Sequence, residues 1–164
     1  MTDRVRVLLV DDEVDFVDYM TRHLKANSLD VLAFNNPVRA LEETGDQVFD
    51  VGLLDLKMPG MDGEELLRRF KQRDPGMEII ILTGHPSIES AFRTSKNGAY
   101  EYLNKPCDFD VLLGTINKAY AKRIKNLNRN QSERVDTLMK SASRLSPLEL
   151  LKRLKGLRKS KKRR

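Results

Sequence analysis

Five short apolar runs, each followed by a stretch with helical spacing, constrain the fold of this chain more than any other feature. The runs cover residues 5–10, 31–34, 51–54, 78–82 and 100–103. Short, almost wholly apolar strands are typical of a parallel sheet that helices cover on both faces. Right-handed crossovers then place the carboxyl ends of all strands along one edge. The pattern predicts an α/β fold with a doubly wound, five-stranded parallel sheet.

The stretches between these runs predict helices. Apolar residues at helical spacing place them at about 14–27, 37–44, 64–73, 86–96 and 108–124. Asn36 before Pro37 is a typical helix start, with an N-cap residue followed by proline at the first helical position. We therefore assign residues 1–124 to one domain and residues 125–164 to an extension.

Length and composition narrow the class of protein. The 164 residues are enough for one domain with a buried core, and no stretch approaches the roughly 20 apolar residues that span a bilayer. The start of the chain leads into a strand rather than a signal peptide. The single cysteine, Cys107, cannot form an internal disulfide and is assigned a packing role. We expect a cytoplasmic protein without a transmembrane segment.

Polar side chains follow four of the predicted strands. Asp11 and Asp12 come after the first strand, Asp55 after the third, Thr83 ends the fourth, and Lys105 follows the fifth. Because these strand ends share one edge, we expect the side chains to converge there. Clustered carboxylates are costly unless a cation neutralises them, and hard oxygen ligands suit Mg²⁺. The pattern predicts a magnesium site in which Asp55 attacks phosphorus and forms an aspartyl phosphate, with Lys105 and Thr83 stabilising phosphoryl oxygens.

Other interpretations begin from the same residues. Each polar residue alone has an ordinary role as a helix cap, a turn residue or a solvated charge, and only their joint placement favours a site. Phosphatases of the haloacid-dehalogenase type also use an aspartate nucleophile at a strand end. They need an acid/base group two residues later, where this chain has Lys57. A flavin-binding protein would need a Ser/Thr/Gly-rich phosphate loop after the first strand, which this chain lacks.

Residues 4–124 resemble the receiver domain of response regulators in bacterial two-component signalling, a CheY-like domain with a flavodoxin-like (βα)5 fold. The resemblance rests on the motifs LLVDDE, LLDLKMPGMDG, IILTGH and YEYLNKP. The stretches DLKMPGMDG and LTGHPSIESAF are most similar to receivers of NtrC-type transcription activators.

The resemblance implies a role for each acidic residue. Asp55 would be the phosphoacceptor, and a sensor histidine kinase would be the phosphodonor. Asp12 would bind Mg²⁺ directly and Asp11 through water, with Asp55 and the backbone carbonyl of Lys57 completing the protein ligands. The resemblance also implies that the domain is not an enzyme beyond self-catalysed phosphotransfer and slow autodephosphorylation.

The resemblance further implies how the signal leaves the site. Lys105 would pair with the phosphoryl group and Thr83 would move to bond it. Tyr102 would turn inward when Thr83 moves, altering the face around the fourth helix and fifth strand that a downstream protein target reads. Gly84 would leave room for the phosphodonor, and the bond before Pro106 would be cis.

The extension differs sharply in charge from the domain. Residues 1–121 carry 14 Lys and Arg against 21 Asp and Glu, whereas residues 122–164 carry 16 against 3. We expect a basic extension that is helical or partly disordered. Apolar residues approach helical spacing with a polar interruption at 128–134, and pairing between two copies of the chain is one interpretation. Ser146 and Glu149 form a capping box around Pro147, followed by the leucines 150, 151, 154 and 157.

Several roles are open for this extension. It can be a solvated tail, dock to a protein surface, or contact an anionic membrane or nucleic acid. No aromatic residue follows Tyr120, so contact with nucleic acid would be mostly with phosphate. We favour a receiver that signals through protein contacts, and the alternative is a DNA-binding transcriptional regulator that uses the basic tail.

Overall fold

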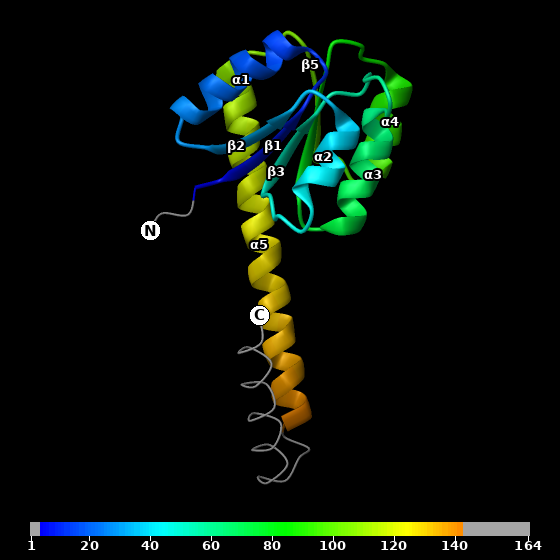
Figure 1. Cartoon of the computed structure of the whole chain (residues 1–164). Coiled ribbons are helices and arrows are strands. Elements are labelled where there is room, and N and C mark those ends of the chain that lie inside the picture. The colour runs from blue at the N-terminus through cyan, green and yellow to red at the C-terminus, as the bar shows by residue number, and fades with distance from the viewer. Residues whose placement is uncertain (1–3, 143–164) are drawn as a thin grey trace. The chain divides into compact units, whose positions relative to one another are not determined.

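The computed structural model describes residues 4–142, and the chain divides into two compact units, Met1–Lys125 and Asn126–Arg164. Strands and helices alternate along the first unit (Figure 1). The capping box at Ser146, Pro147 and Glu149 and the leucine stripe after it lie outside the described residues. The elements are β1 Arg6–Val10, α1 Val14–Ala26, β2 Asp30–Phe34, α2 Pro37–Thr44, β3 Val51–Leu54, α3 Gly63–Arg73, β4 Glu78–Thr83, α4 Ile88–Lys96, β5 Glu101–Asn104 and α5 Phe109–Ala142.

The strands form one parallel sheet in the order β2-β1-β3-β4-β5. Figure 1 shows α2, α3 and α4 together on one side of this sheet. The other side packs against α1 and the first turns of α5 through a core that includes Val17, Leu24, Leu112 and Ile116. The predicted doubly wound α/β fold is confirmed.

Alternate residues of the central strands build two separate apolar cores. In β1, Val7 and Leu9 face the core under α1 and α5, whereas Leu8 and Val10 face the core under α2 and α3. Each of these four side chains is at most 1% exposed. Burial on both faces explains why the strands read as continuous apolar runs rather than alternating ones. Burial of the strands on both faces also holds their carboxyl ends, which carry the polar residues, in fixed positions.

Side-chain caps define the starts of two helices beside the site. The Asn36 side chain accepts from Val38 N at 2.9 Å, which confirms the predicted start of α2. The α4 helix begins at Ile88, two residues later than predicted at Pro86. Ser87 is its N-cap and accepts from the backbone of Ser90 at 3.0 Å.

Helix α5 is longer than predicted. We expected it to end near Ile124, but it continues without a break to Ala142. The segment 128–134 is polar yet contains no glycine or proline, so it interrupts the apolar stripe without interrupting the backbone hydrogen bonds. One helical turn joins Arg129 and Glu133 in an ion pair at 3.9 Å. Among residues 4–142, none of the helices has the length and apolar character needed to span a membrane.

Candidate functional site

Three aspartates meet at the carboxyl ends of β1 and β3. One carboxylate oxygen from each of Asp11, Asp12 and Asp55 lies within 4.8 Å of the others. The strand register causes this, because Val10 pairs with Leu54 and the next residues are Asp11 and Asp55. Asp11 is 1% exposed and Asp55 is 4% exposed, while Asp12 is half-buried. The structure therefore brings the predicted acidic residues together in a largely desolvated cluster.

The Asp11 carboxylate is held on both oxygens. Oδ2 accepts from Lys105 Nζ at 2.5 Å, and Oδ1 accepts from Glu13 N at 3.0 Å. Burial nevertheless raises the pKa of Asp11 to about 6, because desolvation outweighs the hydrogen bonds from Lys105 and Glu13, and the nearby charge of Asp55 adds to the rise. A second positive charge near this cluster would offset that cost.

One oxygen of Asp55 stands apart from the other polar atoms of the site. Asp55 Oδ1 is buried and accepts no hydrogen bond from any of the described residues. A buried carboxylate oxygen without a donor is costly, and it points to a group that the site is built to receive. Three carboxylates at these separations offer hard oxygen ligands to a divalent cation. The acidic cluster can therefore hold a metal ion, as predicted.

Lys105 reaches the cluster from the end of the edge strand β5. Its ammonium contacts Asp11, forms a second ion pair with Glu13 Oε1 at 2.9 Å, and lies 4.1 Å from the centre of the Phe16 ring. Burial alone would lower the pKa of Lys105. The hydrogen bonds with Asp11 and Glu13 outweigh this effect, so the pKa of Lys105 is raised overall. The Lys105–Pro106 peptide is cis, as expected. We did not predict the contributions of Glu13 and Phe16, although Glu13 ends the motif LLVDDE and Phe16 follows three residues later.

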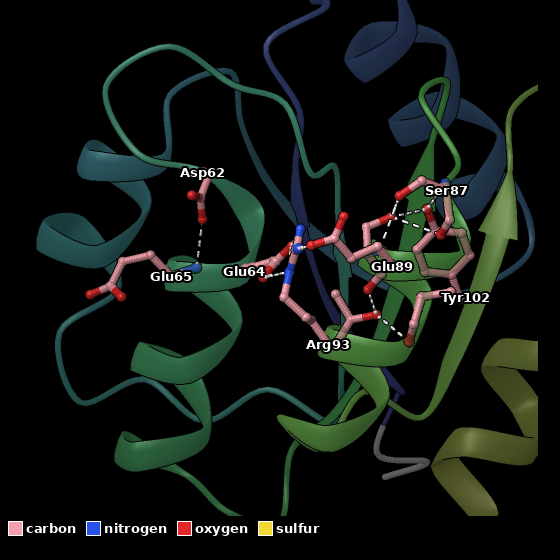
Figure 2. A network of polar contacts seen from close by, with 10 residues as sticks. Asp62, Glu64, Glu65, Ser87, Glu89, Arg93 and Tyr102 are labelled. Atoms are coloured by element: carbon pink, nitrogen blue, oxygen red, sulfur yellow. Dashed lines mark hydrogen bonds and ion pairs between the residues drawn. The ribbon is translucent and has the colours of Figure 1, made fainter.

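Thr83 and Tyr102 lie on neighbouring strands beside the cluster. Thr83 is fully buried, and its Oγ1 accepts from His85 N at 3.2 Å. Tyr102 is half-buried, and its hydroxyl reaches the start of α4, where it contacts Ser90 Oγ at 2.8 Å and Ser87 N at 3.3 Å (Figure 2). Neither serine was predicted to belong to the site, because nothing in their spacing indicates a contact with β5.

The loop after Asp55 returns close to the backbone of Asp55 itself. Gly63 N donates to Leu56 O at 2.8 Å, and a Cβ on Gly63 would lie 2.0 Å from the Asp55 carbonyl oxygen. Only glycine allows this approach. In contrast, a Cβ on Gly84 would meet no atom within 4 Å. Lys57 is exposed, and with His85 and Arg93 it lines a groove of about 440 Å³ between this loop and α4.

Residues 7–117 match the sequence model of the response regulator receiver domain. The chain belongs to this family. Transcriptional regulatory protein ZraR from Escherichia coli is 37% identical over 119 residues, which cover 73% of this chain and 27% of ZraR. The DNA-binding transcriptional regulator NtrC from Escherichia coli is 36% identical over 113 residues, covering 69% of this chain and 24% of NtrC. The chain thus spans about a quarter of the length of these curated relatives.

Solved receiver domains share the fold over nearly their whole length. A CheY-like receiver domain protein from Methanospirillum hungatei has a TM-score of 0.73 and 29% identity, covering 76% of this chain and 99% of its own. A receiver domain protein from Clostridium thermocellum has a TM-score of 0.70 and 34% identity, covering 75% and 98%. These matches confirm the predicted family and its likeness to NtrC-type regulators. The domain is a receiver of two-component signalling, that is, a phosphoacceptor switch.

Proposed function

We propose that Asp55 accepts a phosphoryl group from the phosphohistidine of a sensor histidine kinase. The observation that carries this proposal is the buried Asp55 Oδ1, which has no donor among the described residues. A carboxylate oxygen of Asp55 attacks phosphorus, the phosphorus–nitrogen bond to the kinase histidine breaks, and its electron pair returns to the imidazole. The product is an aspartyl phosphate. The other residues of the site position the phosphoryl group and balance its charge.

The acidic cluster supports Mg²⁺ as the cation. We assign Asp12 and Asp55 as direct ligands, with the backbone carbonyl of Lys57, and Asp11 as a ligand through water. When bound, Mg²⁺ neutralises the carboxylates and the incoming phosphoryl oxygens. Asp11 is suited to the outer position because both its oxygens already accept hydrogen bonds, from Lys105 and from the backbone of Glu13.

Lys105 and Thr83 would stabilise the product. The Lys105 ammonium is charged and already directed into the cluster by Asp11, Glu13 and the Phe16 ring. It can pair with a phosphoryl oxygen by a short displacement from Asp11. The Thr83 hydroxyl donates to a second phosphoryl oxygen, and Tyr102 follows to alter the face around α4 and β5. A downstream protein target would read that altered face.

Residue 57 does not favour turnover of phosphate esters at this site. The position two residues after Asp55, where haloacid-dehalogenase phosphatases carry their acid/base, is the exposed Lys57 rather than an aspartate. We therefore assign only self-catalysed phosphotransfer and slow hydrolysis of the aspartyl phosphate. The domain acts as a switch whose state lasts until water removes the phosphoryl group.

Phosphorylation by a small donor tests this assignment. The full chain is incubated with phosphoramidate and Mg²⁺, and its intact mass is measured. We expect one added phosphoryl group on the wild type, none on Asp55→Asn, and none after Mg²⁺ is chelated. Modification of Asp55→Asn to the wild-type extent would show that another residue is the acceptor.

A second candidate function is DNA binding through the extension. We propose 1–124 as the receiver and 125–164 as a separate basic segment. Residues 122–164, which include this segment, carry 16 Lys and Arg against 3 Asp and Glu. The matched relatives are named as transcriptional regulators, which favours this alternative. A gel-shift assay would compare the full chain with one cut after Lys125. Equal, weak binding by both chains would remove the DNA-binding alternative.

A further inference from the structure

Helix α4 is anchored to the domain by polar rather than apolar side chains. Its buried residues are Ser90 and Thr94, at 7% and 0% exposure. Its large apolar residues face outward instead, since Ile88 is 92% exposed and Phe92 is 60% exposed. A helix held in this way gains little from apolar burial, so a few hydrogen bonds decide its position.

Ser90 lies at the centre of those hydrogen bonds. Its Oγ contacts Tyr102 Oη at 2.8 Å, Ser87 Oγ at 2.8 Å and the Ser87 carbonyl oxygen at 3.1 Å. Ser87 N also donates to the Tyr102 hydroxyl at 3.3 Å. Figure 2 shows Tyr102 of β5 beside Ser87 at the start of α4, joined by these contacts.

Each hydroxyl of this network has one proton, and one arrangement uses all of them. Ser90 Oγ donates to the Ser87 carbonyl, and Ser87 Oγ donates to Ser90 Oγ. Because Ser90 Oγ donates its proton to the Ser87 carbonyl, Tyr102 donates to Ser90 Oγ, and the Tyr102 oxygen accepts from Ser87 N. The hydroxyl of Tyr102 is thus fully engaged with the first turn of α4. Rotation of the Tyr102 ring away from this turn would break both of these bonds.

We infer that Ser90 is a positioning residue, which holds Tyr102 to the first turn of α4 and so sets how readily the switch moves. This inference rests on the proposed function of Asp55 and Tyr102. These bonds stabilise the conformation in which Tyr102 lies against the first turn of α4. Removing the Ser90 hydroxyl shifts the equilibrium away from that conformation by the free energy of one net hydrogen bond, which changes the equilibrium constant about three- to tenfold.

The other side of α4 supplies a matched control. Arg93 forms an ion pair with Glu64 of α3 at 2.8 Å, and this contact holds α4 without involving Tyr102 (Figure 2). Glu64→Gln therefore loosens α4 independently of the tyrosine hydroxyl. Any effect that comes merely from a less firmly held helix should appear in this variant, with or without the Tyr102→Phe substitution.

Binding of beryllium fluoride, a phosphoryl analogue, with Mg²⁺ measures the equilibrium. The full chain is labelled with fluorotyrosine, and the ¹⁹F resonance of Tyr102 is assigned by its loss in Tyr102→Phe. We expect the affinity of Ser90→Ala for beryllium fluoride to differ from that of wild type by about three- to tenfold. Its Tyr102 resonance should also move before any analogue is added. In a Tyr102→Phe background, Ser90→Ala should change the affinity for beryllium fluoride less than about twofold. Glu64→Gln should change this affinity by the same factor in the wild-type and the Tyr102→Phe backgrounds.

The outcomes separate the two proposals. A wild-type chain that binds no beryllium fluoride would overturn the proposed function itself. If the wild type binds but Ser90→Ala has unchanged affinity, the role of Ser90 is wrong while the proposed function stands. An equal effect of Ser90→Ala in the wild-type and Tyr102→Phe backgrounds would likewise reduce Ser90 to a structural residue of α4.

Discussion

The close approach of Gly63 to Asp55 makes Gly63→Ala an informative substitution. The added Cβ would lie 2.0 Å from the Asp55 carbonyl oxygen and 2.7 Å from Leu56 Cα. Carbon and oxygen atoms in favourable contact are about 3.3 Å or more apart, so the backbone must separate by roughly 1.3 Å. No rotamer change can relieve this contact, because both atoms belong to the backbone. The substitution therefore moves either Asp55 or the first turn of α3.

The displacement should lower both the free energy of unfolding and the rate of phosphorylation. Forcing an extra methyl group into a packed region costs about 1–3 kcal/mol, and we expect the upper half of that range because the contact is with backbone. A displacement of about 1 Å at the reacting group lowers the reaction rate by about 100-fold. The free energy of unfolding is measured by urea denaturation, and the rate by phosphoramidate phosphorylation with Mg²⁺.

Gly114→Ala is the matched control. A Cβ on Gly114, within helix α5, would meet no atom within 4 Å. Alanine is the better helix former, so this variant should gain up to about 1 kcal/mol of stability and keep the wild-type phosphorylation rate. If Gly63→Ala matches wild type in both stability and rate, the contact with Asp55 does not constrain the site and this reasoning is wrong.

Two further predictions concern buried charge. Without Mg²⁺, the folded pKa of Asp11 is about 6 against 3.8 for the free group, so protonation favours the folded state. Stability should therefore fall by up to about 3 kcal/mol as pH rises from about 4 to about 6, and urea denaturation of Asp11→Asn should lack this slope. Arg123, whose side chain is 5% exposed, pairs with Asp50 at 3.1 Å and Asp74 at 3.0 Å. Arg123→Met should lower the free energy of unfolding by about 3 kcal/mol in the same assay, because the two partly buried carboxylates lose their cationic partner. A loss below about 1 kcal/mol would contradict this reasoning.

The acidic cluster could be predicted because it follows from strand order alone. Once five buried strands run parallel, the residues after them share one edge, and Asp11 and Asp55 become neighbours without any knowledge of side-chain packing. The contact between Lys105 and Asp11 joins residues 94 positions apart and was predictable for the same reason.

Contacts that depend on packing were not predictable. The bond between Ser90 and Tyr102 depends on how α4 lies against β5, and the contact of Gly63 with Asp55 depends on the path of one loop. Neither contact follows from a hydrophobic period, and although Asp55 and Gly63 lie in one motif, the motif alone does not show that their backbones meet. The end of α5 was placed too early, at about Ile124, because the apolar stripe weakens there, whereas helix continuity depends on backbone hydrogen bonds.

Locating the phosphoryl group tests the central claim most directly. The wild-type chain is phosphorylated with phosphoramidate and Mg²⁺ and then treated with borohydride, which reduces an aspartyl phosphate to homoserine. Peptide mass spectrometry then identifies the reduced position. We predict homoserine at position 55 alone, and none when Mg²⁺ is omitted. Homoserine in place of Asp11 or Asp12, or a stable phosphoryl group on another residue type, would contradict the assignment of Asp55 as the phosphoacceptor.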